Sequence, residues 1–153
     1  MEREVFHIIP AGAGPIWLFG VVALVVAAMA GMLGFMVYSS RHATFEVTQK
    51  GLRIRGDIYG RMIPIESIVL DKARKTDLLV EHHLQPIVRT NGAGLPGYSA
   101  GWFRLRDGEK ALIFVTDRTR VAYVPTKNGY SVMMSVEDPG GLAAAIRKAA
   151  TQQ

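Results

Sequence analysis

The sequence predicts a mainly β domain that follows one N-terminal membrane-spanning helix and ends in a short α-helix. Three observations lead to this. The first is an uncharged apolar run, and the second is a series of short alternating segments with turn residues between them. The third is an amphipathic segment with helix-start signals near the end. We expect a tail at residues 1–15, a transmembrane helix at 16–38, a juxtamembrane linker at 39–43 and one β domain at 44–153.

The apolar run extends from Ile16 to Tyr38 and holds no charged residue over 23 positions. A helix of that length measures about 35 Å, which suffices to cross the hydrocarbon core of a bilayer. A cleaved signal peptide is the alternative, but it would have a basic start and a shorter apolar core. A buried helix of a soluble domain is disfavoured because the run is apolar on all sides. We therefore predict a membrane anchor.

Small residues in this helix recur at four-residue spacing, at Ala23, Ala27 and Gly31. Such a face lets helix backbones approach closely in lipid, although Ala and Gly are frequent in membrane helices in any case. Orientation depends on the basic residues around the helix. Arg41 and Lys50 follow it, whereas Arg3 and the terminal amine precede it, so the positive-inside rule favours a cytoplasmic domain.

The charge of residues 39–153 is basic. Lys and Arg number 17 when Arg3 is set aside, and Asp and Glu number 11 when Glu2 and Glu4 are set aside. Such a surface prefers acidic partners, and anionic lipid is the nearest one to an anchored domain. The chain has no cysteine, which excludes disulfides, thiolate metal sites and a thiol nucleophile.

Alternating segments after the helix predict antiparallel strands. Residues 44–48 and 52–55 flank the turn Gln49-Lys50-Gly51 and predict a first hairpin. Residues 60–70 predict a strand that is interrupted by a turn at Pro64, typical of an edge or a bend. Residues 102–106, 111–116, 120–126 and 130–136 then predict four consecutive strands in a meander, and Asp107-Gly108 marks the first turn.

The ending predicts a helix at about residues 138–150. Asp138 is a suitable N-cap and Pro139 is tolerated in the first turn. Apolar residues recur at helical spacing from Leu142 to Ala149, which predicts one buried face.

The segment GYSAGWFRLRDGEKALIFVTDRTRVAYVPT and the ending SVMMSVEDPGGLAAAI resemble the bacterial pleckstrin-homology-like domains, particularly the small membrane-anchored kind. The positions that match the family pattern are Gly97, Tyr98, Gly101, Thr116, Asp117, Ser135, Asp138 and Pro139. Gly140-Gly141-Leu142 departs from it, because the family often has a large apolar residue there. The resemblance implies a small barrel of two nearly orthogonal antiparallel sheets, capped by the last helix, in a bacterial inner-membrane protein. It implies no catalytic residues.

A glycine-rich stretch, residues 89–101, predicts irregular structure because it holds four glycines and a proline. Its centre is a candidate partner-binding loop, with the alternative that it packs on its own domain; the residues are Gly94, Leu95, Pro96, Gly97 and Tyr98. Nucleotide binding is disfavoured because no Gly-Lys-Ser/Thr follows.

Catalysis and metal binding have little support. Glu81, His82 and His83 are metal-ligand types, but adjacent residues of a strand point to opposite faces, which favours a polar strand end or loop. The serines lack a nucleophile-elbow context, so we expect no enzymatic activity and no cofactor.

Basic residues on the predicted hairpins alternate with apolar ones and project outward. They are candidate lipid contacts, with an ordinary solvated surface as the alternative: Lys50, Arg53, Arg55, Arg104 and Arg106. Nucleic-acid binding is disfavoured because no aromatic platform interleaves with these strands.

The sequence therefore predicts a non-enzymatic, membrane-anchored binding module that engages a membrane protein partner or associates with its own copies. We expect no small-molecule substrate. A sensor of anionic lipid headgroups is the first alternative, and a hydrolase or metal enzyme is the second.

Overall fold

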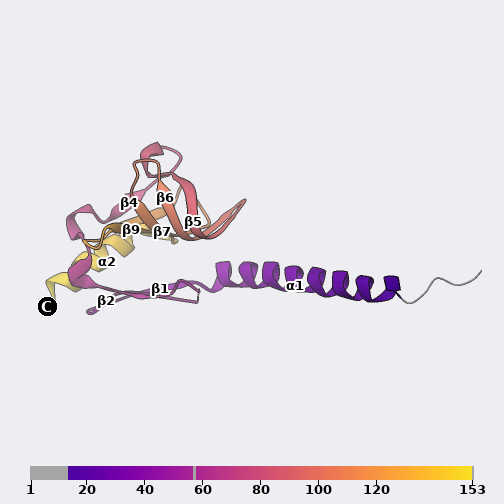
Figure 1. Cartoon of the computed structure of the whole chain (residues 1–153). Coiled ribbons are helices and arrows are strands. Elements are labelled where there is room, and N and C mark those ends of the chain that lie inside the picture. The colour runs from indigo at the N-terminus through magenta and orange to yellow at the C-terminus, as the bar shows by residue number, and fades with distance from the viewer. Residues whose placement is uncertain (1–13, 57, 153) are drawn as a thin grey trace, which may run out of the picture. The chain divides into compact units, whose positions relative to one another are not determined.

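A computed structural model describes residues 14–56 and 58–152 of the chain. The chain forms two compact units, residues 1–38 and 39–153 (Figure 1). The tail expected at residues 1–15 lies outside the described residues, except for Gly14 and Pro15, which begin a helix.

Helix α1 spans Gly14–His42, so it includes the predicted transmembrane segment and continues through Ser39–His42, most of the expected linker. Val, Ala, Gly, Leu and Met dominate it, and no proline interrupts it after Pro15. Large apolar side chains are exposed along its length, for example Phe19 and Leu24. The stretch Ile16–Phe35 is long and apolar enough to cross a membrane, by length and composition.

Within the described residues, the second unit contains nine strands in two sheets, the α-helix α2 and short 3₁₀ turns. A three-stranded antiparallel sheet has the order β1-β2-β3, with strands Thr44–Thr48, Gly51–Arg55 and Met62–Pro64. The predicted first hairpin is confirmed, with Phe45 opposite Ile54. Pro64 ends the edge strand β3, in agreement with the expectation of an edge or bend.

The larger sheet has six strands in the order β4-β8-β9-β7-β6-β5. The strands are β4 (Arg74–Thr76), β5 (Pro86–Leu95), β6 (Tyr98–Leu105), β7 (Lys110–Val115), β8 (Val121–Pro125) and β9 (Tyr130–Ser135). Short 3₁₀ turns connect the sheets and strands: η1 (Ile65–Ser67), η2 (Leu70–Lys72) and η3 (His82–Leu84).

The meander prediction is wrong at one point. The hairpins β6–β7 and β8–β9 form as predicted, but β9 lies between β7 and β8 and pairs with β7 in parallel. The reason is a connection at residues 116–120 that crosses over the end of β9, where the Ser135 hydroxyl binds backbone groups of Thr116 and Asp117. Local alternation predicts each strand and cannot specify this long-range order.

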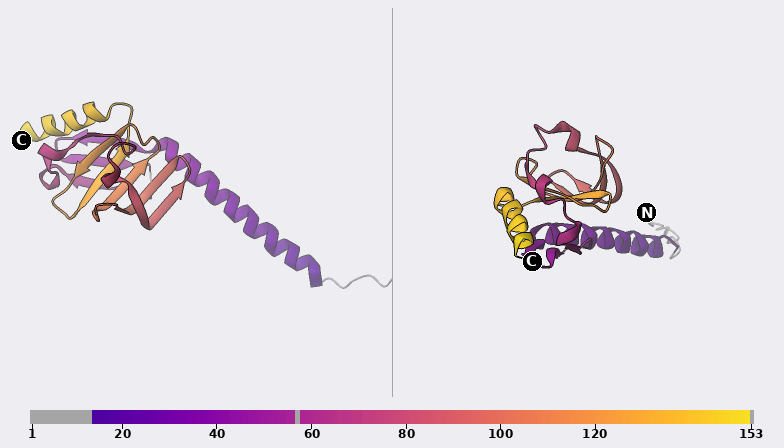
Figure 2. Two further views of the ribbon diagram at one scale, coloured as in Figure 1. Left: turned by 90° about the horizontal axis from the view of Figure 1, so that it is seen from above. Right: turned by 90° about the vertical axis from the view of Figure 1, so that its left-hand side faces the viewer.

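In the part of the chain that the structure describes, the two sheets form a sandwich and do not close into the small barrel that the resemblance implied. After β3 the chain enters the turns η1 and η2, because Pro64 has no N–H with which to continue a ladder. Within the described residues one isolated bridge, Ile68 with Thr126, joins this connection to the strands of the large sheet. Figures 1 and 2 show the two sheets as separate layers.

Helix α2, Pro139–Thr151, agrees with the predicted helix within a residue or two at each end. The Asp138 carboxylate accepts a hydrogen bond from the Gly141 N–H at 2.8 Å and is the predicted N-cap. α2 contacts β1 and β2 of one sheet and β4 and β8 of the other, so it spans one open side of the sandwich (Figure 2). The buried side chain of Ile146 lies in the core there.

Two clusters of buried apolar side chains cover the two faces of the large sheet. The first fills the space between the two sheets and α2 and includes Leu52, Leu112 and Val132. The second lies on the opposite face, where Leu78 and Leu84 of the β4–β5 connection cover Ile113 and Met133.

Candidate functional site

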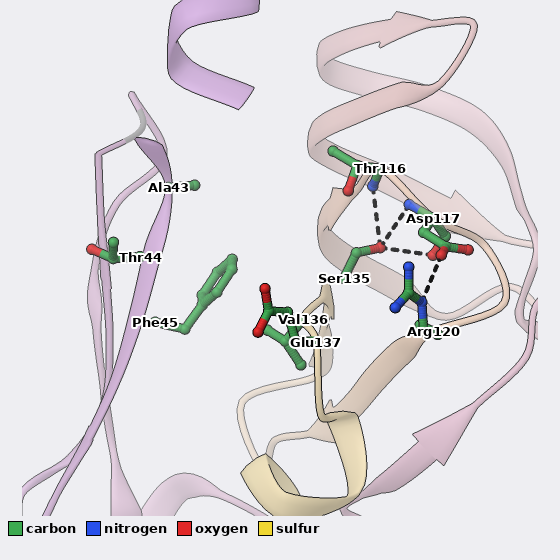
Figure 3. A pocket seen from close by; sticks show the side chains of 9 residues that line it. All are labelled: Ala43, Thr44, Phe45, Thr116, Asp117, Arg120, Ser135, Val136 and Glu137. Atoms are coloured by element: carbon green, nitrogen blue, oxygen red, sulfur yellow. Dashed lines mark hydrogen bonds and ion pairs between the residues drawn. The ribbon is translucent and has the colours of Figure 1, made fainter. Parts of the chain in front are cut away.

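An open cavity of about 620 Å³ lies beside the N-terminal half of β1. Figure 3 shows the side chain of Phe45 directed from β1 toward Val136 and Glu137. Phe45 also packs edge-on against Phe114, with ring centroids 5.8 Å apart, so this wall is continuous with the core. The opposite wall carries Asp117 and Arg120.

The Ser135 hydroxyl organises that opposite wall. Its oxygen accepts hydrogen bonds from the backbone N–H groups of Thr116 at 3.1 Å and Asp117 at 3.0 Å. The same hydroxyl donates to the Asp117 carbonyl oxygen at 2.7 Å. These three bonds fix the connection between β7 and β8 to the end of β9.

Asp117 is ionised over the whole physiological pH range. Hydrogen bonds from the Thr119 hydroxyl and backbone N–H, and then from Arg120, lower the pKa of its carboxyl to about 2. The Arg120 Nε lies 2.9 Å from Oδ2 of this carboxylate. Glu137 is exposed on the same cavity, so the wall carries two carboxylates and one guanidinium.

A second cavity, of about 360 Å³, lies beside the C-terminal half of the same strand. Val47, Thr48 and Gln49 form one wall, and α2 forms the other with Ala145, Lys148, Ala149 and Gln152. β1 is an edge strand, with β2 as its one neighbour in the sheet. We call these two cavities together the β1 groove.

The groove has apolar walls formed by Phe45, Val47, Val136, Ala145 and Ala149, and its two ends differ in charge. The carboxylates of Asp117 and Glu137 lie at one end together with the guanidinium of Arg120, which leaves one net negative charge there, and Lys148 lies at the other end. An edge strand beside such a groove can accept an extended segment, since backbone groups supply pairing and pockets accept alternate side chains.

The predicted partner-binding loop is not irregular, and that expectation is wrong. Gly94 and Leu95 end β5, Tyr98 begins β6, and Pro96-Gly97 is the turn of a hairpin. Two glycines make the pairing possible: Gly92 and Gly101 face each other with φ of +154° and +112°, and a Cβ on either would lie within 2.5 Å of a backbone oxygen. Glycine therefore supports a strand pair here, while a binding role for the tip stays a prediction.

The five candidate basic residues lie on two different sheets. Lys50, Arg53 and Arg55 belong to the small sheet and its first turn, and Arg55 forms an ion pair with Glu46 at 3.5 Å. Arg104 lies on β6 and Arg106 in the turn that follows, and Arg104 donates to the Gly108 carbonyl oxygen at 3.2 Å. Their contact with lipid stays a prediction.

Ala23, Ala27 and Gly31 lie on α1, where all three residues are exposed. No heavy atom lies within 4 Å of a Cβ placed on Gly31, so a second helix would have room to approach. Helix packing through this face stays a prediction.

Glu81, His82 and His83 lie at the start of η3, not on a strand. The Arg74 guanidinium donates to both carboxylate oxygens of Glu81, the Thr76 hydroxyl donates at 2.6 Å, and these bonds lower the pKa of Glu81 to about 2. The carboxylate is thus part of an ion pair at the edge of the large sheet. In the residues that the structure describes, no group of three or more His, Asp or Glu could hold a metal ion.

Sequence reasoning did not find the β1 groove. Phe45 and Val47 were interpreted as one face of a strand, and Ser135 and Asp117 as positions of a family pattern. No local signal joins residue 45 to residues 117 and 137, because strand order and the crossing connection bring them together.

A family model described as Bacterial PH domain matches residues 43–150. The chain belongs to the bacterial PH domain family. This confirms the resemblance, which depended on the β6–β9 segment and the entry to α2. Domains of this kind are in general non-catalytic binding modules, and PH domains generally bind lipids or proteins. Neither a curated protein nor a solved structure matches this bacterial PH domain protein.

Proposed function

We propose that this protein is a membrane-anchored, non-enzymatic binding module whose PH domain takes an extended segment of a membrane protein partner in the β1 groove. The observation behind the proposal is that cavities flank both halves of one edge strand. Because most edge strands are covered, charged or bulged to prevent pairing, a short edge beside two cavities is a suitable place for strand addition.

The anchor in this proposal is α1. Its stretch Ile16–Phe35 has 20 residues, equivalent to about 30 Å of helix, and none of it is buried. A core helix of a soluble protein would bury much of such a surface, which favours a span over that alternative. We place the helix in the inner membrane of a bacterium, with residues 39–153 in the cytoplasm, in accordance with the basic residues that follow it.

The chemistry of the partner segment follows from the walls of the groove. Phe45 and Val136 favour an apolar side chain near one end, and Val47, Ala145 and Ala149 favour a second one along the strand. Arg120 is paired with Asp117, so the first end keeps one net negative charge, which the exposed Glu137 carries and which favours a basic residue there. Lys148 favours an acidic residue at the other end. The preferred segment is therefore extended, apolar in the middle and oppositely charged at its ends.

Site-specific photo-crosslinking in native membranes tests this proposal. We would replace Phe45 with benzoylphenylalanine in the full chain and, in a separate variant, replace Tyr98 at the β5–β6 hairpin. We expect a covalent adduct with a partner protein from the position of Phe45. Adducts that form from the position of Tyr98 alone would assign binding to the hairpin tip and refute the groove.

A matched pair on α2 provides the control. Ala145 lines the groove, and its exposed neighbour Ala144 does not line it. Ala145→Phe fills the second cavity and should abolish the adduct from position 45, whereas Ala144→Phe should leave it unchanged. An equal yield from both variants would contradict the proposal. An adduct with the mass of two copies of this chain would identify the partner as a second copy.

A further inference from the structure

A basic and aromatic cluster occupies a corner of the sandwich that is separate from the β1 groove. Two cations contact the indole ring of Trp102 on β6, with Arg61 Cζ 4.9 Å and Lys110 Nζ 4.4 Å from its centroid. Tyr130 on β9 packs edge-on against the same ring at 5.1 Å. We call these residues, together with Arg104, the Trp102 corner.

The sheet register places Arg104 in this cluster. Arg104 is two residues from Trp102 on β6, so the two side chains lie on the same face. Arg104 is also directly opposite Lys110 of β7, which in turn is opposite Tyr130 of β9. Arg61 comes from the connection between β2 and β3, so a loop of the small sheet and two strands of the large sheet contribute cations to one site.

The three cations have no acidic partner among the described residues. The four ion pairs found there involve other basic side chains. The two acids of the nearby turn have other contacts: Glu109 accepts a hydrogen bond from the Tyr123 hydroxyl at 2.9 Å, and Asp107 accepts one from the Glu109 N–H at 2.9 Å. Arg61, Arg104 and Lys110 therefore place three positive charges close together, and neither Asp107 nor Glu109 forms an ion pair with them.

Such an arrangement costs stability unless something compensates for it. Like charges directly opposite each other on neighbouring strands repel, and Arg104 and Lys110 are such a pair. Contact with the indole face offsets part of the cost for Arg61 and Lys110, and it also holds their charged ends in place before any ligand arrives. An anion bound between them would reduce the repulsion and gain charge-assisted hydrogen bonds.

We propose that the Trp102 corner is a binding site for a phosphate group. Three cations match the charge and the several oxygens of a phosphate better than a carboxylate, which has one charge and two oxygens. The guanidinium of Arg61 supplies a planar fork and the ammonium of Lys110 supplies a point charge, the two donor types that proteins use for phosphate. A lipid headgroup and free phosphate are two sources of this chemistry, and the experiment below distinguishes them.

Tryptophan fluorescence provides a direct readout. The chain contains two tryptophans, Trp17 in α1 and Trp102, so Trp17→Phe makes Trp102 the single reporter. The full chain in nanodiscs of zwitterionic phosphatidylcholine is titrated with inorganic phosphate at constant ionic strength. We expect a saturable change in Trp102 emission at millimolar concentration, because the two cations over the ring reorient toward the anion.

Variants test which residues are responsible. Replacing Arg61 and Lys110 together with Gln should weaken phosphate binding about tenfold or more. Lys110→Arg should retain binding, since it keeps the charge. Lys75→Gln makes the same kind of charge change at an exposed position of β4 and is the matched control, so it should leave the dissociation constant unchanged.

Each remaining outcome supports or overturns the site. A shift in Trp102 emission in phosphatidylglycerol nanodiscs before phosphate is added identifies a lipid headgroup as the source, and a normal titration there identifies free phosphate. The absence of a saturable change, an equal loss of binding in Lys75→Gln, or an equal response to a dicarboxylate would overturn the phosphate site. The photo-crosslinking test of the β1 groove is independent, so either proposal can fail alone.

Discussion

Replacing Ser135 with alanine tests how the crossing connection is held. The Ser135 hydroxyl makes three hydrogen bonds to backbone groups of residues 116 and 117, at 3.1, 3.0 and 2.7 Å. Alanine removes the hydroxyl and all three hydrogen bonds at once, so the N–H groups of Thr116 and Asp117 and the Asp117 carbonyl oxygen lose this partner. No apolar contact of comparable size replaces these bonds.

The expected cost follows from these three bonds. A net contribution of about 1 kcal/mol for each would give about 3 kcal/mol, and water can replace part of it because the site is partly exposed. We therefore expect Ser135→Ala to lower the free energy of unfolding by about 2 kcal/mol. For a unit of the size of residues 39–153, this corresponds to a fall in Tm of about 8 °C.

Ser131 provides a matched control on the same face of the same strand. Its hydroxyl is buried in the same strand, and no hydrogen bond joins it to residues 116–120 among the described residues, so Ser131→Ala leaves the connection attached. That change should cost clearly less than Ser135→Ala. The assay is urea and thermal unfolding of the full Trp17→Phe chain in detergent, followed by Trp102 fluorescence. Equal stability of the two variants would refute the role of Ser135 as the clamp of the connection.

Three further predictions concern other parts of the chain. Hydrogen bonds from Arg74 lower the pKa of the Glu81 carboxyl from 4.5 to about 2 in the folded state. The ionised carboxylate therefore stabilises the fold at a pH above 4.5, and this stabilisation is lost as the pH falls from 4.5 toward 2. Glu81→Gln should therefore reduce the loss of unfolding free energy between pH 7 and pH 3, and an unchanged pH profile would contradict this. Gly101→Ala should cost about 3 kcal/mol in urea unfolding, since φ is +112° and a Cβ would meet backbone, whereas Gly97→Ala, with open space around it, should cost about 1 kcal/mol. Ala27→Leu should lower the yield of cross-linked dimer in membranes if small residues form a packing face, and an unchanged yield would exclude this face.

The sequence predicts well what depends on neighbouring residues. The β1–β2 hairpin, the β6–β7 turn at Asp107-Gly108 and the N-cap of α2 at Asp138 all appear where local pattern and turn chemistry indicate them. Each depends on residues within a few positions of one another. The long apolar helix α1 is also predicted from neighbouring residues alone.

The errors concern contacts between distant segments. Alternation in residues 130–136 predicts a strand but not its place between β7 and β8. Gly92 and Gly101 were interpreted as signs of irregular structure, whereas they let two backbones approach closely in a ladder. The Trp102 corner was missed for the same reason, because Arg61 comes from the distant connection between β2 and β3 and no spacing in the sequence relates it to Lys110. Folding brings these residues together, and only the strand order shows it.

The central position of β9 has a consequence for how the protein is made. Its neighbours β7 and β8 are synthesised first, and without β9 they have no strand between them with which to pair. α1 leaves the ribosome long before residue 135, so an anchored chain would reach the membrane with the middle of its large sheet still open. The six-stranded sheet is therefore completed from the inside, by a late strand, at a time when its apolar faces have the greatest chance of pairing with another chain.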